Sequence, residues 1–192
     1  MQIIEGDHMR ILIAGIVGGI AMFVWMSIAH LATPLATTGF SRIPNESAVT
    51  STMQNSIGAK PGLYFFPWMD PHDPNAMKMQ EEKLKTQPSG LLMYKPAGGG
   101  MAPSMMIAEF AKETVTALIA AFLLAQAMLA GYFARVGFVS LIGLAAALTT
   151  NVSYAIWYGF PTSYTLAYGF IDFFGYVVAG LVIAAILRPK MT

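Results

Sequence analysis

Apolar residues are concentrated in four long stretches of the chain that carry almost no charge. Residues 11–32 contain no Asp, Glu, Lys or Arg, and residues 105–132 are apolar after Glu113. Residues 136–159 are uncharged, and residues 163–187 contain only Asp172. About 20 apolar residues at ~1.5 Å per residue are needed to cross a bilayer as a helix. The pattern therefore predicts four transmembrane helices.

The segment between the first two stretches, residues 33–104, is polar and rich in turn residues. Within it, Asn45 and Gly58 bracket a short amphipathic stretch, which predicts a helix over 46–57 with Asn45 as its N-cap. Asp73-Pro74 resembles an N-cap and first turn, which predicts a second helix over 75–85.

Two similar apolar pieces of this segment, residues 62–67 and 90–96, are bounded by glycine and proline. They are predicted to pair as strands. We therefore expect an all-α membrane protein, a four-transmembrane-helix bundle with a small extracytoplasmic α/β or irregular cap between helices 1 and 2.

The basic residues next to the apolar stretches predict the orientation of the chain. Lys and Arg are retained on the cytoplasmic side of short flanks, and the flanks here contain Arg10, Arg135, Arg188 and Lys190. We expect residues 1–10 and 188–192 to be cytoplasmic tails and residues 33–104 to lie outside. The expected location is the plasma (inner) membrane of a prokaryote, as a multi-pass protein.

Composition excludes several classes of function. Of the 192 residues, 56% are hydrophobic and only 11% are charged, against roughly 25% charged residues in soluble domains. The formal net charge of +1 provides no basic field for nucleic acid. The absence of cysteine removes disulfides, thiolate catalysis and iron–sulfur clusters.

Polar residues inside the apolar stretches form the candidate site. They are His30, Glu109, Glu113, Asn151 and Asp172. Ionisable groups in spanning helices are costly and normally face the interior of the bundle. Asn151 and Asp172 lie at matching depths on stretches joined by a short turn, so we expect a direct or one-water contact between them. All five residues fall in the outer half of the predicted bundle.

Small residues repeat at helical spacing on the same faces as these polar groups, which predicts close helix packing. They are Gly15, Gly19, Ala117, Ala121, Gly143, Ala147, Gly175 and Ala179.

Two sets of residues are candidates for metal binding. Glu109 and Glu113 share a helix face and, with His30 and Asp172, would offer carboxylate and imidazole ligands. The second set is Met69, His72, Met77 and Met79. Thioethers with an imidazole suit Cu(I), and such runs resemble those of extracytoplasmic copper-handling proteins. No resident cofactor is otherwise expected.

No catalytic motif is present: the sequence contains no G-x-S-x-G elbow, no Walker loop and no H-E-x-x-H. The order of segments is similar to that of claudin-like tetraspan proteins, but the tryptophan and cysteine signature of that family is missing. We expect a non-catalytic membrane subunit or assembly factor of a larger respiratory, photosynthetic or transport complex, with other membrane subunits and the lipid bilayer as partners. The alternative is a small binding or transport protein with an outward-facing polar pocket, for a metal ion such as copper.

Overall fold

The computed structural model describes residues 5–100 and 102–188 and is mostly helical, with 69% of the chain in helices. The chain divides into two compact units. One, here called the helical unit, comprises Met1–Phe40 and Ala102–Thr192, and the other, the small unit, comprises Ser41–Met101. Residues 33–40 and 102–104, which the sequence analysis assigned to the outer segment, therefore belong to the helical unit.

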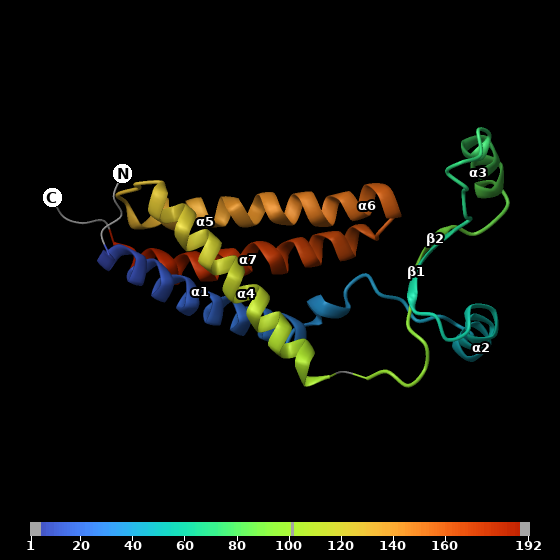
Figure 1. Cartoon of the computed structure of the whole chain (residues 1–192), viewed down its shortest axis with the longest axis horizontal. Helices are drawn as coiled ribbons and strands as arrows, with labels where there is room; N and C mark the ends of the chain where they lie inside the picture. Colours follow the sequence, from blue (N-terminus) through green and yellow to red (C-terminus); the bar gives the residue numbers. More distant parts are fainter. Residues whose placement is uncertain (1–4, 101, 189–192) are drawn as a thin grey trace. The chain divides into compact units, whose positions relative to one another are not determined.

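The helical unit contains long helices that lie side by side (Figure 1). Its elements are α1 (Glu5–Leu31), η1 (Pro34–Thr37), α4 (Pro103–Gln126), α5 (Tyr132–Ala147), η2 (Leu148–Val152), α6 (Ser153–Tyr158) and α7 (Thr162–Ile186). Helix α1 begins within the expected tail 1–10, so that residues 5–10 are helical. Residues 1–4 and the expected tail residues 189–192, including Lys190, lie outside the described residues.

The turn between α4 and α5 lies earlier in the chain than the hydropathy pattern indicates. Helix α4 ends at Gln126, and α5 begins at Tyr132 after Gly131. Arg135 is therefore inside α5 and not in a turn, contrary to the sequence analysis. The reason is that the connecting residues 127–131 are as apolar as the helices they separate, so hydropathy does not show the break.

Glycines allow α1 and α4 to pack closely in antiparallel directions. A Cβ on Gly19 would lie 2.6 Å from Thr114 Cα, and one on Gly15 would lie 2.7 Å from Leu118 Cα. The edge-to-face pair of Phe23 and Phe110 continues the contact, with ring centroids 5.4 Å apart. Glycine is required at both positions because any side chain would meet the backbone of α4.

Helix α7 packs between α1 and α5, again through glycine. A Cβ on Gly143 of α5 would lie 2.4 Å from Tyr176 Cβ, and Gly175 of α7 faces Met22 and Trp25 of α1. Trp25 Nε1 also donates a 2.9 Å hydrogen bond to the Ile171 carbonyl. The structure buries all eight of the small residues singled out from the sequence: Gly15, Gly19, Ala117, Ala121, Gly143, Ala147, Gly175 and Ala179.

Three helices among the described residues are long and apolar enough to cross a membrane: His8–Leu31, Tyr132–Tyr158 and Thr162–Ile186. The second of these runs continuously through α5, η2 and α6. Helix α4 is of similar length, 24 residues, but its first half carries Glu109, Lys112 and Glu113. Because of these three charged residues, α4 is not among the helices apolar enough to cross a membrane.

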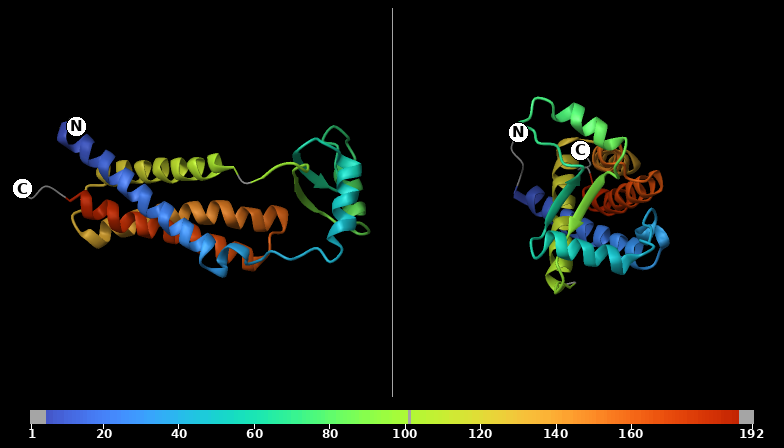
Figure 2. Two further views of the ribbon diagram at one scale, coloured as in Figure 1. Left: turned by 90° about the horizontal axis from the view of Figure 1, so that it is seen from below. Right: turned by 90° about the vertical axis from the view of Figure 1, so that its right-hand side faces the viewer.

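The small unit contains α2 (Glu46–Ile57), β1 (Gly62–Phe66), α3 (Ala76–Leu84) and β2 (Gly90–Tyr94). The strands pair antiparallel, with Gly62 opposite Tyr94 and Phe66 opposite Gly90, as the sequence predicts (Figure 2). Helix α2 has the predicted bounds. Helix α3 begins after Asn75, and the expected cap Asp73 instead accepts a 2.8 Å hydrogen bond from the Asn75 backbone N–H.

Candidate functional site

Asn151 lies in a short π-helical segment, η2, between α5 and α6. Three successive carbonyls before and at this segment accept side-chain hydrogen bonds. Thr149 Oγ1 donates to Ala145 and Ala146 at 2.8 and 3.1 Å, and Asn151 Nδ2 donates to Ala147 at 3.2 Å. A π turn disturbs the regular helical ladder and is frequent at functional sites. Here Thr149 and Asn151 supply donors that the disturbed backbone needs.

Asn151 and Asp172 are in direct contact. Asn151 is 5% exposed, and its Nδ2 donates a 2.8 Å hydrogen bond to Asp172 Oδ2 on α7. This contact confirms the prediction made from the matching depths of the two residues. The bond joins the third apolar stretch to the fourth, and it gives the half-buried Asp172 carboxyl a partner inside a helix of high hydropathy.

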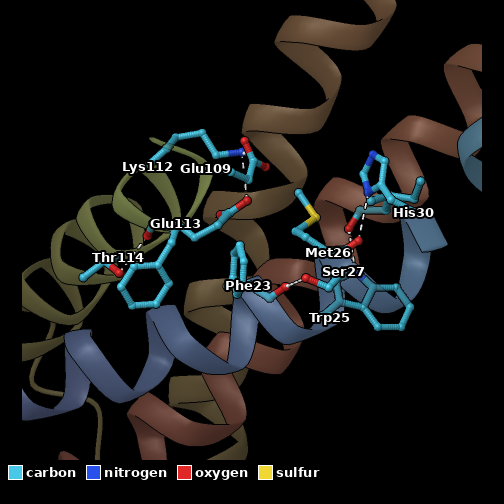
Figure 3. A network of polar contacts seen from close by, with 11 residues as sticks. Phe23, Trp25, Met26, Ser27, His30, Glu109, Lys112, Glu113 and Thr114 are labelled. Carbon is cyan, nitrogen blue, oxygen red and sulfur yellow. Dashed lines mark hydrogen bonds and ion pairs between the residues drawn. The ribbon is translucent and has the colours of Figure 1, made fainter. Parts of the chain in front are cut away.

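Helix α4 carries a compact arrangement of three charged residues (Figure 3). Lys112 Nζ lies 2.9 Å from Glu109 Oε1 and 2.8 Å from Glu113 Oε1, so that one ammonium group faces two carboxylates. The side chain of Glu113 is 1% exposed, whereas those of Lys112 and Glu109 are 54% and 42% exposed. The sequence analysis did not include Lys112 among the candidate site residues. The missed signal was its i, i+3 spacing from Glu109.

The buried end of this arrangement faces α7. Ala117 and Ala121, one and two turns after Glu113 on α4, share one buried core with Ala179 and Ile183 of α7. Glu113 Oε1 is fully buried and has no hydrogen bond of good geometry in addition to its ion pair with Lys112. The helical unit therefore buries Glu113 on α4 and, separately, the hydrogen-bonded pair of Asn151 and Asp172.

Among the described residues, His30 forms no hydrogen bond or ion pair with the other four candidate polar residues. It is exposed at the end of α1, and its Nδ1 donates a 2.9 Å hydrogen bond to the Met26 carbonyl. Its ring lies edge-on to Tyr168 of α7, with centroids 6.0 Å apart. Figure 3 shows His30 apart from Lys112 and its two glutamates. The last turn of α1 directs the His30 side chain towards Tyr168. Helical spacing alone does not predict this contact.

Aromatic residues cover the end of the helical unit next to His30. Tyr164 stacks on Tyr168 with centroids 4.2 Å apart, and the Tyr168 hydroxyl donates a 3.1 Å hydrogen bond to the Ala36 carbonyl in η1. Gly39 has φ +87°, and a Cβ there would lie 2.5 Å from Tyr164 Cβ. These contacts tie the segment after α1 to the start of α7.

Arg135 lies at the opposite end of the helices and has a structural role there. It is 5% exposed, and its guanidinium donates to the Ala130 carbonyl at 2.8 Å and to the Ala184 carbonyl at 3.0 Å. Ala184 belongs to the last turn of α7, where carbonyls lack helical partners and cations are favoured. The sequence analysis used Arg135 only as a marker of orientation.

The structure does not gather the proposed metal ligands. Within residues 5–100 and 102–188, no group of three or more His, Cys, Asp or Glu side chains is placed to hold a metal ion. In the small unit, Met77 and Met79 are two residues apart on α3, a spacing that directs side chains to different sides of a helix. Both are exposed, as is His72, and Met69 is half-buried.

Comparisons with known proteins do not assign the chain to a family. No protein-family model, curated protein or solved structure matches it. The site must therefore be interpreted from its own geometry, which is a set of paired polar groups in a largely apolar helical unit.

Replacing Asn151 with leucine is expected to lower stability. The change removes the donor to Asp172 and to the Ala147 carbonyl, and an unpaired buried polar group costs about 1–3 kcal/mol. Thermal unfolding in detergent, followed by circular dichroism, measures the effect. Thr165→Val is the control, because it removes an exposed hydroxyl bonded only to its own helix. Equal melting temperatures for the two variants would contradict the structural role of Asn151.

Proposed function

We propose that the protein spans the membrane four times, with α4 as the fourth spanning helix. Support comes from α4's length of 24 residues and from its close glycine-mediated packing on α1. Lys112 partly neutralises the two glutamates, and the most buried carboxylate faces the interior of the helical unit. Charged residues within spanning helices normally pair in this way.

The proposed orientation places the ends carrying Arg10 and Arg188 in the cytoplasm of a prokaryotic cell, by the retention of basic residues on that side. The buried Arg135 lies at the same end of the helices. The small unit then lies on the outer side, because it connects the C-terminal end of α1 to the N-terminal end of α4. In this orientation the paired polar groups occupy the outer half of the membrane-spanning region.

Within this arrangement the chain acts as a non-catalytic subunit or accessory factor of a larger membrane complex. The observation that carries this proposal is the exposure of the first turns of α4, residues 103–112. Every residue there except Glu109 is exposed, and Glu109 is half-buried. The other helices of the helical unit therefore leave much of these nearly three turns uncovered, apart from the contact of Phe110 with Phe23.

The chemistry of these turns favours a protein neighbour over lipid. They combine apolar side chains such as Ile107, which is 69% exposed, with the half-exposed ion pair of Glu109 and Lys112. Hydrocarbon cannot solvate that pair, whereas polar groups and small residues on a neighbouring helix can. A partner that packs on residues 103–112 would cover both kinds of surface.

Replacing Ala108 with tryptophan is the variant that tests this proposal. Ala108 lies one helical turn before Lys112 on the exposed side of α4, so a bulky side chain there would push a partner helix away. We expect Ala108→Trp protein, purified from its native membrane in mild detergent, to lose stoichiometric partner chains while keeping its melting temperature.

Ala145→Trp is the matched control, since Ala145 is an exposed alanine on α5. It should retain both the partners and the melting temperature. Purification of the unaltered protein alone, or only as copies of itself, would contradict the proposal.

A small binding or transport protein is the second candidate function. The observation in its favour is that the apolar helical unit holds buried polar groups, Glu113 and the hydrogen-bonded pair of Asn151 and Asp172. Asp172→Asn separates the two functions. A binding or transport role predicts an intact assembly that has lost flux or ligand binding, whereas a packing role predicts weakened assembly.

A further inference from the structure

The two strands of the small unit expose one apolar face. The register places Leu63 opposite Met93 and Phe65 opposite Leu91, so these four side chains lie on the same side of the sheet. Leu63 and Met93 are 66% and 74% exposed, and Phe65 is 37% exposed. Single apolar residues on a surface are ordinary, but a contiguous apolar face marks an interaction site.

The opposite face of the same sheet is occupied by the small unit itself. Tyr94 is buried, and its hydroxyl donates a 2.9 Å hydrogen bond to the carbonyl of Gly58 at the end of α2. Tyr64 packs edge-on against Tyr94, with ring centroids 6.4 Å apart. The small unit covers this side, the closed face, at Tyr64 and Tyr94, whereas Phe66 on the same side is 41% exposed. The side of Leu63 and Met93 is the open face.

The residues at the two ends of the open face fit a membrane surface. Lys60 and Lys95 lie at the same end of the sheet, because Gly62 is paired with Tyr94. In the part of the chain that the structure describes, neither lysine forms an ion pair with a carboxylate. Trp68, which is 66% exposed, follows the other end of β1. Tryptophan and lysine at the border of an apolar surface are typical of groups that sit among lipid headgroups.

The connections of the small unit keep it within reach of the membrane surface. Strand β2 ends at Tyr94 and α4 begins at Pro103, a connection that extends roughly 30 Å at most. At its other end the small unit joins the helical unit after Phe40. If α1 and α4 span the membrane, both connections start from the same membrane surface.

We propose that the face formed by Leu63, Phe65, Leu91 and Met93 docks on the outer surface of the bilayer, with Lys60 and Lys95 on anionic phospholipid headgroups. This inference rests on the proposed membrane-spanning arrangement. The face inserts among headgroups and upper acyl chains, while the closed face remains in water. Docking brings the small unit onto the membrane without a partner protein.

Site-directed spin labelling tests this inference on the full chain in nanodiscs of phosphatidylcholine and phosphatidylglycerol. The chain contains no cysteine, so Leu63→Cys and Met93→Cys each provide one label on the open face. Gln54→Cys, on an exposed position of α2, is the aqueous control. Ile119→Cys, on an exposed position of α4, reports on the spanning helix itself.

We expect the labels at 63 and 93 to collide more often with oxygen than with a water-soluble nickel complex, and the label at 54 to show the reverse. Replacing Lys60 and Lys95 with glutamine should reduce the difference at 63 and 93. Nickel accessibility at 63 and 93 equal to that at 54 would overturn the proposal. So would dipolar broadening between chains at these positions, because it would show a second copy on the face.

The label at 119 distinguishes failure of the docking proposal from failure of the proposal that α4 spans the membrane. An oxygen-accessible label at 119 with nickel-accessible labels at 63 and 93 refutes the docking alone. A nickel-accessible label at 119 refutes α4 as a spanning helix, and with it the basis of the docking.

Discussion

Replacing Gly19 with leucine is expected to abolish the packing of α1 on α4. A Cβ at this position would already lie 2.6 Å from Thr114 Cα, whereas carbon atoms in contact prefer about 3.5–4.0 Å. Thr114 Cα is a backbone atom and cannot move away by a change of rotamer, so the two helices must separate. We expect a loss of at least about 3 kcal/mol, at the upper end for an overpacked core, seen as a large drop in melting temperature in detergent.

Gly137→Leu is the matched control for this prediction. Gly137 also lies within a helix, α5, but a Cβ there meets nothing within 4 Å. Leucine is a better helix former than glycine by roughly 0.5–1 kcal/mol, so this variant should be at least as stable as the parent protein. A normal melting temperature for Gly19→Leu would show that α1 and α4 are not packed as described.

Replacing Lys112 with methionine is expected to be the most damaging change of a single charge. It would leave the Glu113 carboxylate, whose side chain is 1% exposed, without the one cation that the described residues place beside it. Removing one partner of a buried ion pair typically costs about 3–5 kcal/mol. Because Lys112 is itself half-exposed, we expect about 2–3 kcal/mol. The melting temperature in detergent measures the loss.

A second substitution shows whether the loss comes from the stranded carboxylate. The double variant Lys112→Met with Glu113→Gln leaves no buried charge, and neutral replacement of a buried pair is often tolerated. We expect the double variant to recover most of the lost stability. Equal instability of the single and double variants would show that Lys112 contributes by packing and not by charge.

Local sequence patterns predicted several elements well. Asn45 and Gly58 bracket α2, and the two glycine-bounded apolar pieces form the antiparallel pair β1 and β2. These bounds and this pairing are predictable because turns and alternation act over a few neighbouring residues, although the side chain of Asn45 makes no capping hydrogen bond. The contact between Asn151 and Asp172 was also predictable, since a short turn fixes the relative depth of the helices that it joins.

Other features depend on contacts between distant residues and were missed. The only sequence feature of the π-helical segment around Asn151 is the run Thr149-Thr150-Asn151. Thr and Asn side chains form the same hydrogen bonds to preceding carbonyls in regular α-helices, so this run does not predict a π-helix. The pairing of Lys112 with the two glutamates was missed, because the direction of its side chain depends on the burial of Glu113. Arg135 indicates a cytoplasmic flank by its type, yet packing against the end of α7 buries it.

The exposure of the first turns of α4, residues 103–112, could not be predicted from the sequence. Residues 103–112 combine apolar side chains with Glu109 and Lys112, a pattern that fits either a polar lining or a loosely covered helix. Within the helical unit, these residues are exposed or half-buried, and Phe110 packs on Phe23 of α1. If α4 spans the membrane as proposed, this half-exposed ion pair favours a neighbour that carries polar groups over lipid alone.

Photo-crosslinking at position 111 in the native membrane tests that claim most directly. A photoreactive residue in place of Ala111, next to Lys112 on the exposed part of α4, should form a discrete adduct with a different polypeptide, identified by mass spectrometry. The same residue in place of the exposed Leu141 on α5 should not form that adduct. Adducts at position 111 with lipid alone, or only with another copy of this chain, would contradict the account.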